Sequence, residues 1–291
     1  MSENAKSIKE LCQVIEEQQE LLRLALWVMS QGPIIFRGHE IKCVLEWDQV
    51  RAASATSLGA SQSLNTILKG SNAVGIPVRD LYPIARGVVE GFINATFFIT
   101  QPVEVSQRAL KHKDYASWKH TNRVIGVGDF AFTLSSCTDP KETAARLFPE
   151  FAGKGQGGWS TLDAPSKIDR IGKVVRFSGG ALLGAYGLIY AISSEIIHGS
   201  VFGMSYFMSA HNSGEMTVEG FQTGTESQVV TILTAVGHAA SGFLAAFAKL
   251  HDCQSLIDAE RSLFERIYNV VQYDGIQEKS SSSASGEGDE D

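Results

Sequence analysis

The sequence has 291 residues, which suits one large domain or two small ones and allows a substantial hydrophobic core. Apolar residues make up 44% of the chain and charged residues 20%, as in an ordinary globular protein. The net charge is −7, but one lysine and five acidic residues lie from Glu278 onward, so the rest is close to neutral. This balance excludes a general electrostatic attraction to nucleic acid, so binding of a polyanion requires a local basic patch.

The cysteines and the N-terminal segment indicate a cytoplasmic protein. The four cysteines are scattered without a C-x-x-C pair, and a disulfide framework would be denser. The first ten residues, MSENAKSIKE, are polar and show no secretory signal. Residues 229–248 carry no formal charge, but their many Ala, Gly, Ser and Thr residues favour a buried bundle helix over a membrane span. We therefore expect no contact with a membrane.

Helical periodicity covers most of the chain. The first predicted helix begins with the capping box Ser7-Ile8-Lys9-Glu10 and ends before Gly32-Pro33. Further helices are predicted, in chain order, at about 40–68, 78–99, 103–124, 139–148, 161–172, 178–198 and 226–273, the last with a break near Asp252. We expect the rest of 126–160 to be irregular and 199–224 to be a glycine-rich loop, with room for a short β-hairpin.

These elements predict an all-α fold. Strands and helices do not alternate as in an α/β protein, and no repeat occurs at solenoid periods. We expect a multi-helix bundle with irregular loop insertions and a disordered acidic C-terminal tail. The expected divisions are an N-terminal helical pair (1–70), a main bundle (71–274) and the tail (275–291).

The segment YAISSEIIHGS, residues 190–200, places Glu195 and His198 three positions apart in an otherwise apolar helix. Two stripes of this helix are apolar or small, so we expect it to be buried on most sides and both side chains to point into the protein. A buried carboxylate must be paired, hydrogen-bonded or neutralised. The helix at 78–99 offers partners, because Arg86 and Glu90 lie one turn apart on an apolar face.

Three interpretations of these four polar residues stay open. They could form a buried network that sets helix register. They could perform phosphodiester chemistry, with His198 as general acid or base, Arg86 holding the phosphate and a glutamate orienting the imidazole. They could bind metal, since Glu195-x-x-His198 is half of a di-iron carboxylate site and Glu90 could supply a further ligand.

No metal or cofactor is expected. The chain contains no second Glu-x-x-His, which a di-iron site would need. The glycine-rich segment AGKGQGGWST lacks the lysine directly before Ser or Thr that a phosphate-binding P-loop requires.

A basic face is predicted on the helix at 103–124, where aromatic residues lie among the cations. Cations and aromatic rings together suit a nucleic-acid backbone. Asp114 and the near-neutral body, however, favour an ordinary solvated helix face. The candidate nucleic-acid-binding residues are Arg108, Lys111, Lys119 and Arg123.

Three segments, ARGVVEGF, GWSTLDAPSKIDRIG and YAISSEIIHGS, together resemble the family catalogued as domain of unknown function 5677 over roughly residues 51–250. The resemblance implies a helical fold. The matching positions are Arg86, Glu90, Trp159, Ser160, Tyr190, Ser194, His198 and Gly199.

That family is in turn similar to the HEPN helical domains, many of which are toxin or antiphage ribonucleases. Those domains use an Arg, four to six residues and then a His on one helix. This sequence departs from the pattern, because Ser194 stands one turn before His198 and only three residues separate Arg108 from His112. Arg86 could take the place of the missing arginine only if the fold brings its helix next to His198.

We therefore expect an HEPN-like protein of stress or defence that acts on RNA or binds it. Its candidate catalytic residues are Arg86, Glu90, Glu195 and His198, and whether it is an enzyme stays open. The alternative is a non-catalytic interaction module in which these residues are structural. By the same resemblance, a homodimer surface is expected on the first helices, since HEPN-like bundles often pair.

Overall fold

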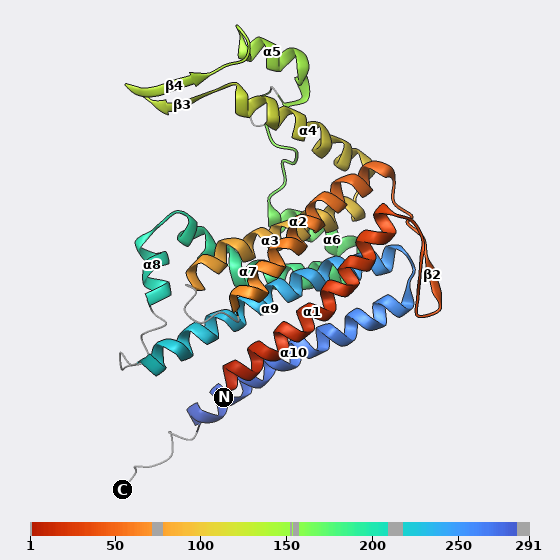
Figure 1. Ribbon diagram of the computed structural model, residues 1–291, viewed down its shortest axis with the longest axis vertical. Coiled ribbons are helices and arrows are strands. Elements are labelled where there is room, and N and C mark those ends of the chain that lie inside the picture. The colour runs from red at the N-terminus through yellow and green to blue at the C-terminus, as the bar shows by residue number, and fades with distance from the viewer. Residues whose placement is uncertain (1, 72–77, 152, 154–156, 209–217, 284–291) are drawn as a thin grey trace.

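The computed structural model describes residues 2–71, 78–151, 153, 157–208 and 218–283, and it confirms the predicted multi-helix bundle (Figure 1). Its α-helices are α1 Glu3–Ser30, α2 Trp47–Ser71, α3 Val78–Thr100, α4 Val103–Thr121, α5 Pro140–Leu147, α6 Ala164–Val174, α7 Arg176–Ile197, α8 Val201–Met208, α9 Val218–Leu250 and α10 Gln254–Ser283. A 3-10 turn, η1, covers Pro149–Phe151, and two antiparallel hairpins pair β1 Ile34–Phe36 with β2 His39–Ile41 and β3 Arg123–Val127 with β4 Phe130–Leu134.

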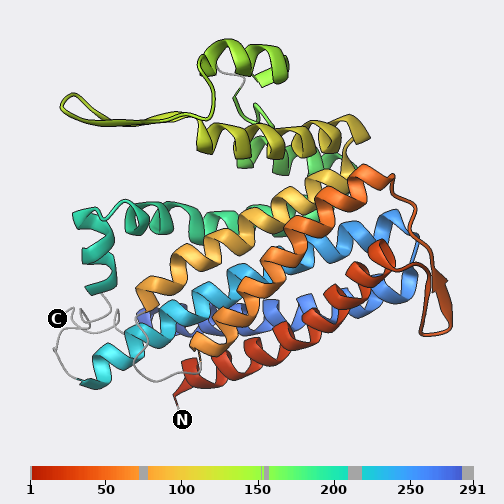
Figure 2. The ribbon, with the colours of Figure 1, turned by 45° about the horizontal axis from the view of Figure 1, so that its top comes forward.

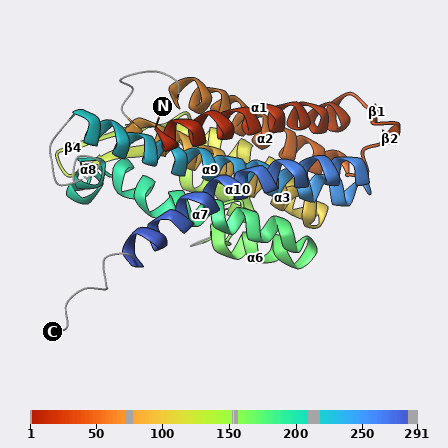
Figure 3. The same cartoon turned by 90° about the horizontal axis from the view of Figure 1, so that it is seen from below.

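Helix α9 is the centre of the bundle, with α1, α3, α7 and α10 packed around it (Figures 1 and 3). Its large side chains, Phe243, Leu244 and Phe247 among them, are fully buried. Its glycines let neighbouring helices approach closely: Gly242 lies against Leu182 of α7, and Gly237 against Ile267 of α10. Helices α1 and α2 share this one hydrophobic core, with α2 packed mainly on α3.

Two helix ends show how local signals operate here. Helix α1 begins earlier than its Ser7 capping box predicts, because the Ser2 side chain accepts a hydrogen bond from the Ala5 N–H while Ser7 is buried inside the helix. The predicted break near Asp252 is confirmed: this residue has φ +48° between α9 and α10. Beyond it, the Cys253 N–H donates to the Ala248 carbonyl, which closes the end of α9.

Other predicted boundaries differ from those of the structure. Helix α2 begins at Trp47, because residues 34–41 form a hairpin, and α4 ends at Thr121. The expected glycine-rich loop at 199–224 instead contains α8 and the first turns of α9, and residues 209–217 lie outside the described chain. Helix α10 continues to Ser283, past its expected end near 273; the remaining part of the predicted tail, 284–291, is outside the described residues.

An arm made of α4, the β3–β4 hairpin and α5 projects from the bundle (Figures 1 and 2). Aromatic rings hold its base together. Tyr115 of α4 stacks on Phe151 of η1 at 5.2 Å between centroids and meets Phe148 edge to face at 5.5 Å. These contacts attach α5 and η1 to α4, whereas the hairpin extends away from them (Figure 2).

Among the residues that the structure describes, two helices are long and apolar enough to cross a membrane. One, 222–250 in α9, has 78% of its most apolar window buried, as expected for the central helix of a bundle. The other is α7, which has 28% of its most apolar window buried. The two helices resemble membrane spans by length and composition only. The expected cytoplasmic location and lack of membrane contact therefore stay predictions.

Candidate functional site

Arg86 and Glu90 of α3 form the ion pair that their spacing suggests. Arg86 Nε lies 2.9 Å from Glu90 Oε1, and the guanidinium lies 4.4 Å from the centroid of the Tyr190 ring on α7. This second contact links α3 to α7, the two helices that were expected to meet. The carboxylate is about two-fifths exposed, so water screens the pair. The Arg86–Glu90 pair is therefore of interest for its position between α3 and α7 and not for its contribution to stability.

Glu195 and His198 do not join this pair. Glu195 is half-buried, and His198 is exposed at the C-terminal cap of α7, so the expectation that both point into the protein was wrong for the histidine. In the described chain, no side-chain hydrogen bond or ion pair connects either residue to Arg86 or Glu90. The reason is that α9 covers one stripe of α7, whereas residues such as Leu183 and Ile197 remain exposed on another.

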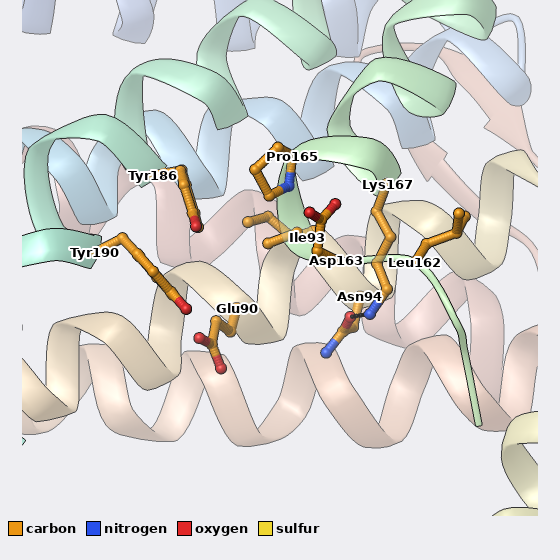
Figure 4. A pocket seen from close by; sticks show the side chains of 10 residues that line it. Glu90, Ile93, Asn94, Leu162, Asp163, Pro165, Lys167, Tyr186 and Tyr190 are labelled. Carbon is orange, nitrogen blue, oxygen red and sulfur yellow. Dashed lines mark hydrogen bonds between the residues drawn. The ribbon is translucent and has the colours of Figure 1, made fainter. Parts of the chain in front are cut away.

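A cleft of about 370 Å³ lies where α3, α6 and α7 meet, and Glu90 forms part of its wall (Figure 4). Side chains from all three helices and from the segment before α6 line it. Figure 4 shows the hydroxyls of Tyr186 and Tyr190 directed toward the side on which Glu90 lies. The lining residues are Glu90, Ile93, Asn94, Leu162, Asp163, Ala164, Pro165, Lys167, Tyr186 and Tyr190.

Lys167 is the least exposed charged group of this cleft, at 9%. Its Nζ donates to Asn94 Oδ1 at 3.0 Å and lies 4.0 Å from the centroid of the Trp159 ring. Burial lowers the pKa of Lys167 to about 8, while the carboxylates of Glu90 and Asp163 oppose this shift. A substantial fraction of this amine is therefore neutral at mildly alkaline pH, as a proton acceptor requires.

Asp163 sits at the mouth of the cleft as the N-cap of α6. Its Oδ1 accepts from the Ser166 N–H at 2.9 Å, and Pro165 follows in the first turn, where a missing N–H costs little. Hydrogen bonds from Ser166 lower the pKa of this carboxyl, so it stays ionised at neutral pH. The cap both begins α6 and directs Lys167 one turn later into the cleft.

Tyr186 and Tyr190 form the aromatic wall. They lie one turn apart on α7 and stack with their centroids 4.4 Å apart. Burial, together with interaction with Tyr190, raises the pKa of Tyr186 to about 12, so this hydroxyl stays protonated. With Lys167 protonated, the cleft and its flank carry two cations, Lys167 and Arg86, and two anions, Glu90 and Asp163.

Of the cleft residues, Glu90 was a predicted site residue and Tyr190 only a position of the family resemblance; Lys167, Asp163 and Tyr186 were not predicted. A signal for Lys167 was present: it lies one turn before Ile171 and next to Ile168, so it falls on the apolar face of a short amphipathic helix. A charge on such a face requires a partner on the neighbouring element. Here the partner is Asn94 of α3.

The predicted basic face is only partly available to a ligand. Arg108 donates to the backbone carbonyls of Glu150, Gly158 and Trp159, and Lys111 pairs with Glu150 at 3.5 Å. Arg108 thus holds the segment that leads toward α6. Lys119 lies 5.9 Å from the Tyr115 ring centroid, and Arg123 is on strand β3, so the four cations do not share one helix.

Within the described ranges, no three His, Cys, Asp or Glu side chains are grouped to hold a metal ion. The cleft itself offers an amine, two tyrosine hydroxyls and two carboxylates as groups that could act chemically. Comparison of the chain with protein-family models, curated proteins and solved structures gave no match.

We expect one lysine to titrate with a pKa of about 8 in NMR spectra of protein labelled with ¹³C at the lysine side chains, because burial disfavours the Lys167 cation. This resonance should disappear in Lys167→Met and persist in Lys173→Met, which removes an exposed lysine of the same helix. If every lysine titrates near the ordinary value of 10.5, the description of the cleft is incorrect.

Proposed function

We propose that the protein acts on RNA by holding one single-stranded nucleotide in the cleft between α3, α6 and α7. The observation that carries this proposal is the pairing of a stacked tyrosine wall with a nearly buried lysine in a cleft of about 370 Å³. Aromatic side chains hold unpaired bases by stacking, and lysine recognises a phosphate as a point charge. Ligand pockets begin at about 300 Å³, so the cleft suits one nucleotide rather than a duplex.

Each polar group has a role in this proposal. Lys167 and the tyrosine hydroxyls donate to phosphate oxygens, and Glu90 accepts a hydrogen bond from a ribose hydroxyl. The neutral form of Lys167 is also suited to accept the proton of a 2′-hydroxyl, which is the first requirement for RNA cleavage. This assignment keeps Arg86 and Glu90 from the HEPN-like hypothesis and replaces the exposed His198 with Lys167.

The experiment measures binding of a short fluorescent single-stranded RNA by fluorescence anisotropy at physiological salt. We expect Lys167→Met to weaken binding at least about tenfold, because it removes a charge-assisted contact from a site of low exposure. Lys173→Met, on the same helix but paired with Asp169 in solvent, should bind like the wild type. A DNA of the same sequence should bind more weakly, since it lacks the 2′-hydroxyl.

Gel analysis of the same RNA separates cleavage from binding alone. Loss of cleavage in Lys167→Met together with activity in His198→Ala would assign the chemistry to the cleft. Equal affinity of wild type and Lys167→Met for RNA, with both variants folded by circular dichroism, would refute the proposal.

The second candidate is a non-catalytic interaction module, and the projecting arm favours it. Arg86 and Glu90 form an ion pair with each other on one helix, as residues with a purely structural role would. The β3–β4 hairpin, by contrast, presents large apolar side chains to solvent.

A further inference from the structure

The β3–β4 hairpin carries an apolar face that the described chain does not cover. A two-residue turn, Gly128-Asp129, joins its strands, with Gly128 at φ +60°. Neither strand packs substantially against any other described element, and Figures 1 and 2 show the hairpin extending beyond the bundle. A two-stranded hairpin is at best marginally stable alone in water, so an exposed one needs another surface.

The pairing register places the apolar residues on one side. Cross-strand partners point to the same face, so Ile125 joins Phe132 and Val127 joins Phe130, while Arg123 and Leu134 complete that face at the base. Val124 and Thr133 point to the opposite side. Phe130 is 91% exposed, Val127 88% and Phe132 57%. Contiguous exposed apolar surface of this kind marks an interaction site.

We propose that this face packs against the same face of a second copy of the chain, forming a two-fold homodimer. At exposures of 91% and 57%, Phe130 and Phe132 together offer about 300 Å² of surface. With the aliphatic residues, each copy offers about 500 Å², so two faces bury about 1,000 Å², which is the lower bound for a specific interface. A two-fold dimer places the same patch of both copies face to face, so the single apolar face of the hairpin is sufficient to form it.

The charges select the orientation. Arg123 lies at the base of the apolar face and Asp129 at the tip, and both are exposed. If the two hairpins pack antiparallel, the tip of one lies over the base of the other, and each Arg123 lies near Asp129 of the second copy. The two Arg123–Asp129 distances are then equal, because both copies have the same five-residue strands, which are about 17 Å long. Tip-to-tip packing would place two Asp129 carboxylates together. A membrane is a poorer occupant, because Asp129 would have to enter it first.

The test is the oligomeric state of the full chain by sedimentation equilibrium over a range of concentrations. We expect a concentration-dependent dimer whose dissociation constant rises at least about tenfold in the double variant Phe130→Ser/Phe132→Ser. Val124→Ser, on the opposite face, is the matched control and should dimerise like the wild type. A monomeric wild type, or a dimer unaffected by the phenylalanine changes, would overturn the proposal.

Exchanging the charges of Arg123 and Asp129 distinguishes a lost dimer contact from a hairpin that does not fold. Arg123→Asp and Asp129→Arg should each weaken the dimer, and the two changes combined should restore it, which a folding defect would not do. The same monomer–dimer series is run with phosphatidylserine vesicles. A wild type that stays monomeric and sediments with vesicles through Phe130 and Phe132 would assign the face to membranes instead. RNA is absent from these assays, so their outcome is independent of the cleft.

Discussion

Gly179→Ala is expected to lower the free energy of unfolding by about 2–3 kcal/mol, although alanine is the better helix former. A Cβ at Gly179 would lie 2.5 Å from the Gly172 Cα and 3.0 Å from the Gly172 N. These are backbone atoms of α6, so no side-chain rotation relieves the overlap and the two helices must separate. The gain in helix propensity, about 1 kcal/mol, is smaller than this cost.

The adjacent residue supplies the control. Gly180 is exposed on the same helix, and a Cβ there would meet no atom within 4 Å. Gly180→Ala should therefore stabilise the protein by about 0.5–1 kcal/mol. Thermal and urea unfolding of the two variants measure the difference, and equal stability would show that α6 and α7 are not in contact at Gly172. Because α6 carries Lys167, Gly179→Ala should also raise the pKa of that lysine toward its ordinary value.

The second large effect is expected at Glu260 of α10, which is 3% exposed in the core. Burial raises its pKa to about 7, although a hydrogen bond with Ser241 and the charge of Arg261 act in the opposite direction. Within the described chain, its Oε1 has no hydrogen-bond partner. Ser241 also accepts a hydrogen bond from Gln18 of α1 at 2.9 Å, so three helices share this buried polar group.

The direction of the pH dependence follows from the raised pKa. Between its ordinary value of 4.5 and about 7, the folded protein holds the Glu260 proton more strongly than the unfolded chain. The stability contributed by this proton is full below pH 4.5 and is lost as the pH rises through 7. The loss is on the order of 3 kcal/mol at most.

Glu260→Gln keeps the shape of the side chain and removes the charge. We expect it to raise the free energy of unfolding by about 1–3 kcal/mol at pH 8 and to change it little at pH 4.5. Glu265→Gln, at an exposed position of α10, should have no such pH-dependent effect. Urea unfolding at the two pH values is the measurement. A variant less stable than wild type at pH 8 would mean that the ionised carboxylate has a partner that stabilises it.

Local sequence signals predicted the helices well, because caps, glycines and 3.6-residue periodicity act over a few positions. They located α3 within one residue at each end and the break at Asp252. They missed the β3–β4 hairpin, although a Gly-Asp turn between two apolar runs was a usable signal. Phe130, Phe132 and Leu134 alternate with smaller residues, as in a strand, but the strands pack on no described part of the core, so this alternation was not read as a strand.

The candidate site was only partly accessible to the same reasoning. Two charges one turn apart on the apolar helix α3 required polar partners, and the structure shows Arg86 and Glu90 paired with each other. The same argument also led to His198, which lies in solvent. The difference is that α2, α9 and α7 pack around α3, whereas His198 is the C-cap of α7 and lies exposed where that helix ends and leads into α8 (Figure 2).

The amino-acid order was therefore sufficient for the fold class, for most of the helix positions and for the faces of those helices suited to burial. Which of those faces is covered depended on the other helices, because α7 has two apolar stripes and α9 packs on one of them. The glycine contact between α6 and α7 then brought Lys167 opposite Asn94 and next to the tyrosines. Such a cleft depends on close approach between segments distant in the chain, and periodicity along one helix carries no information about that distance.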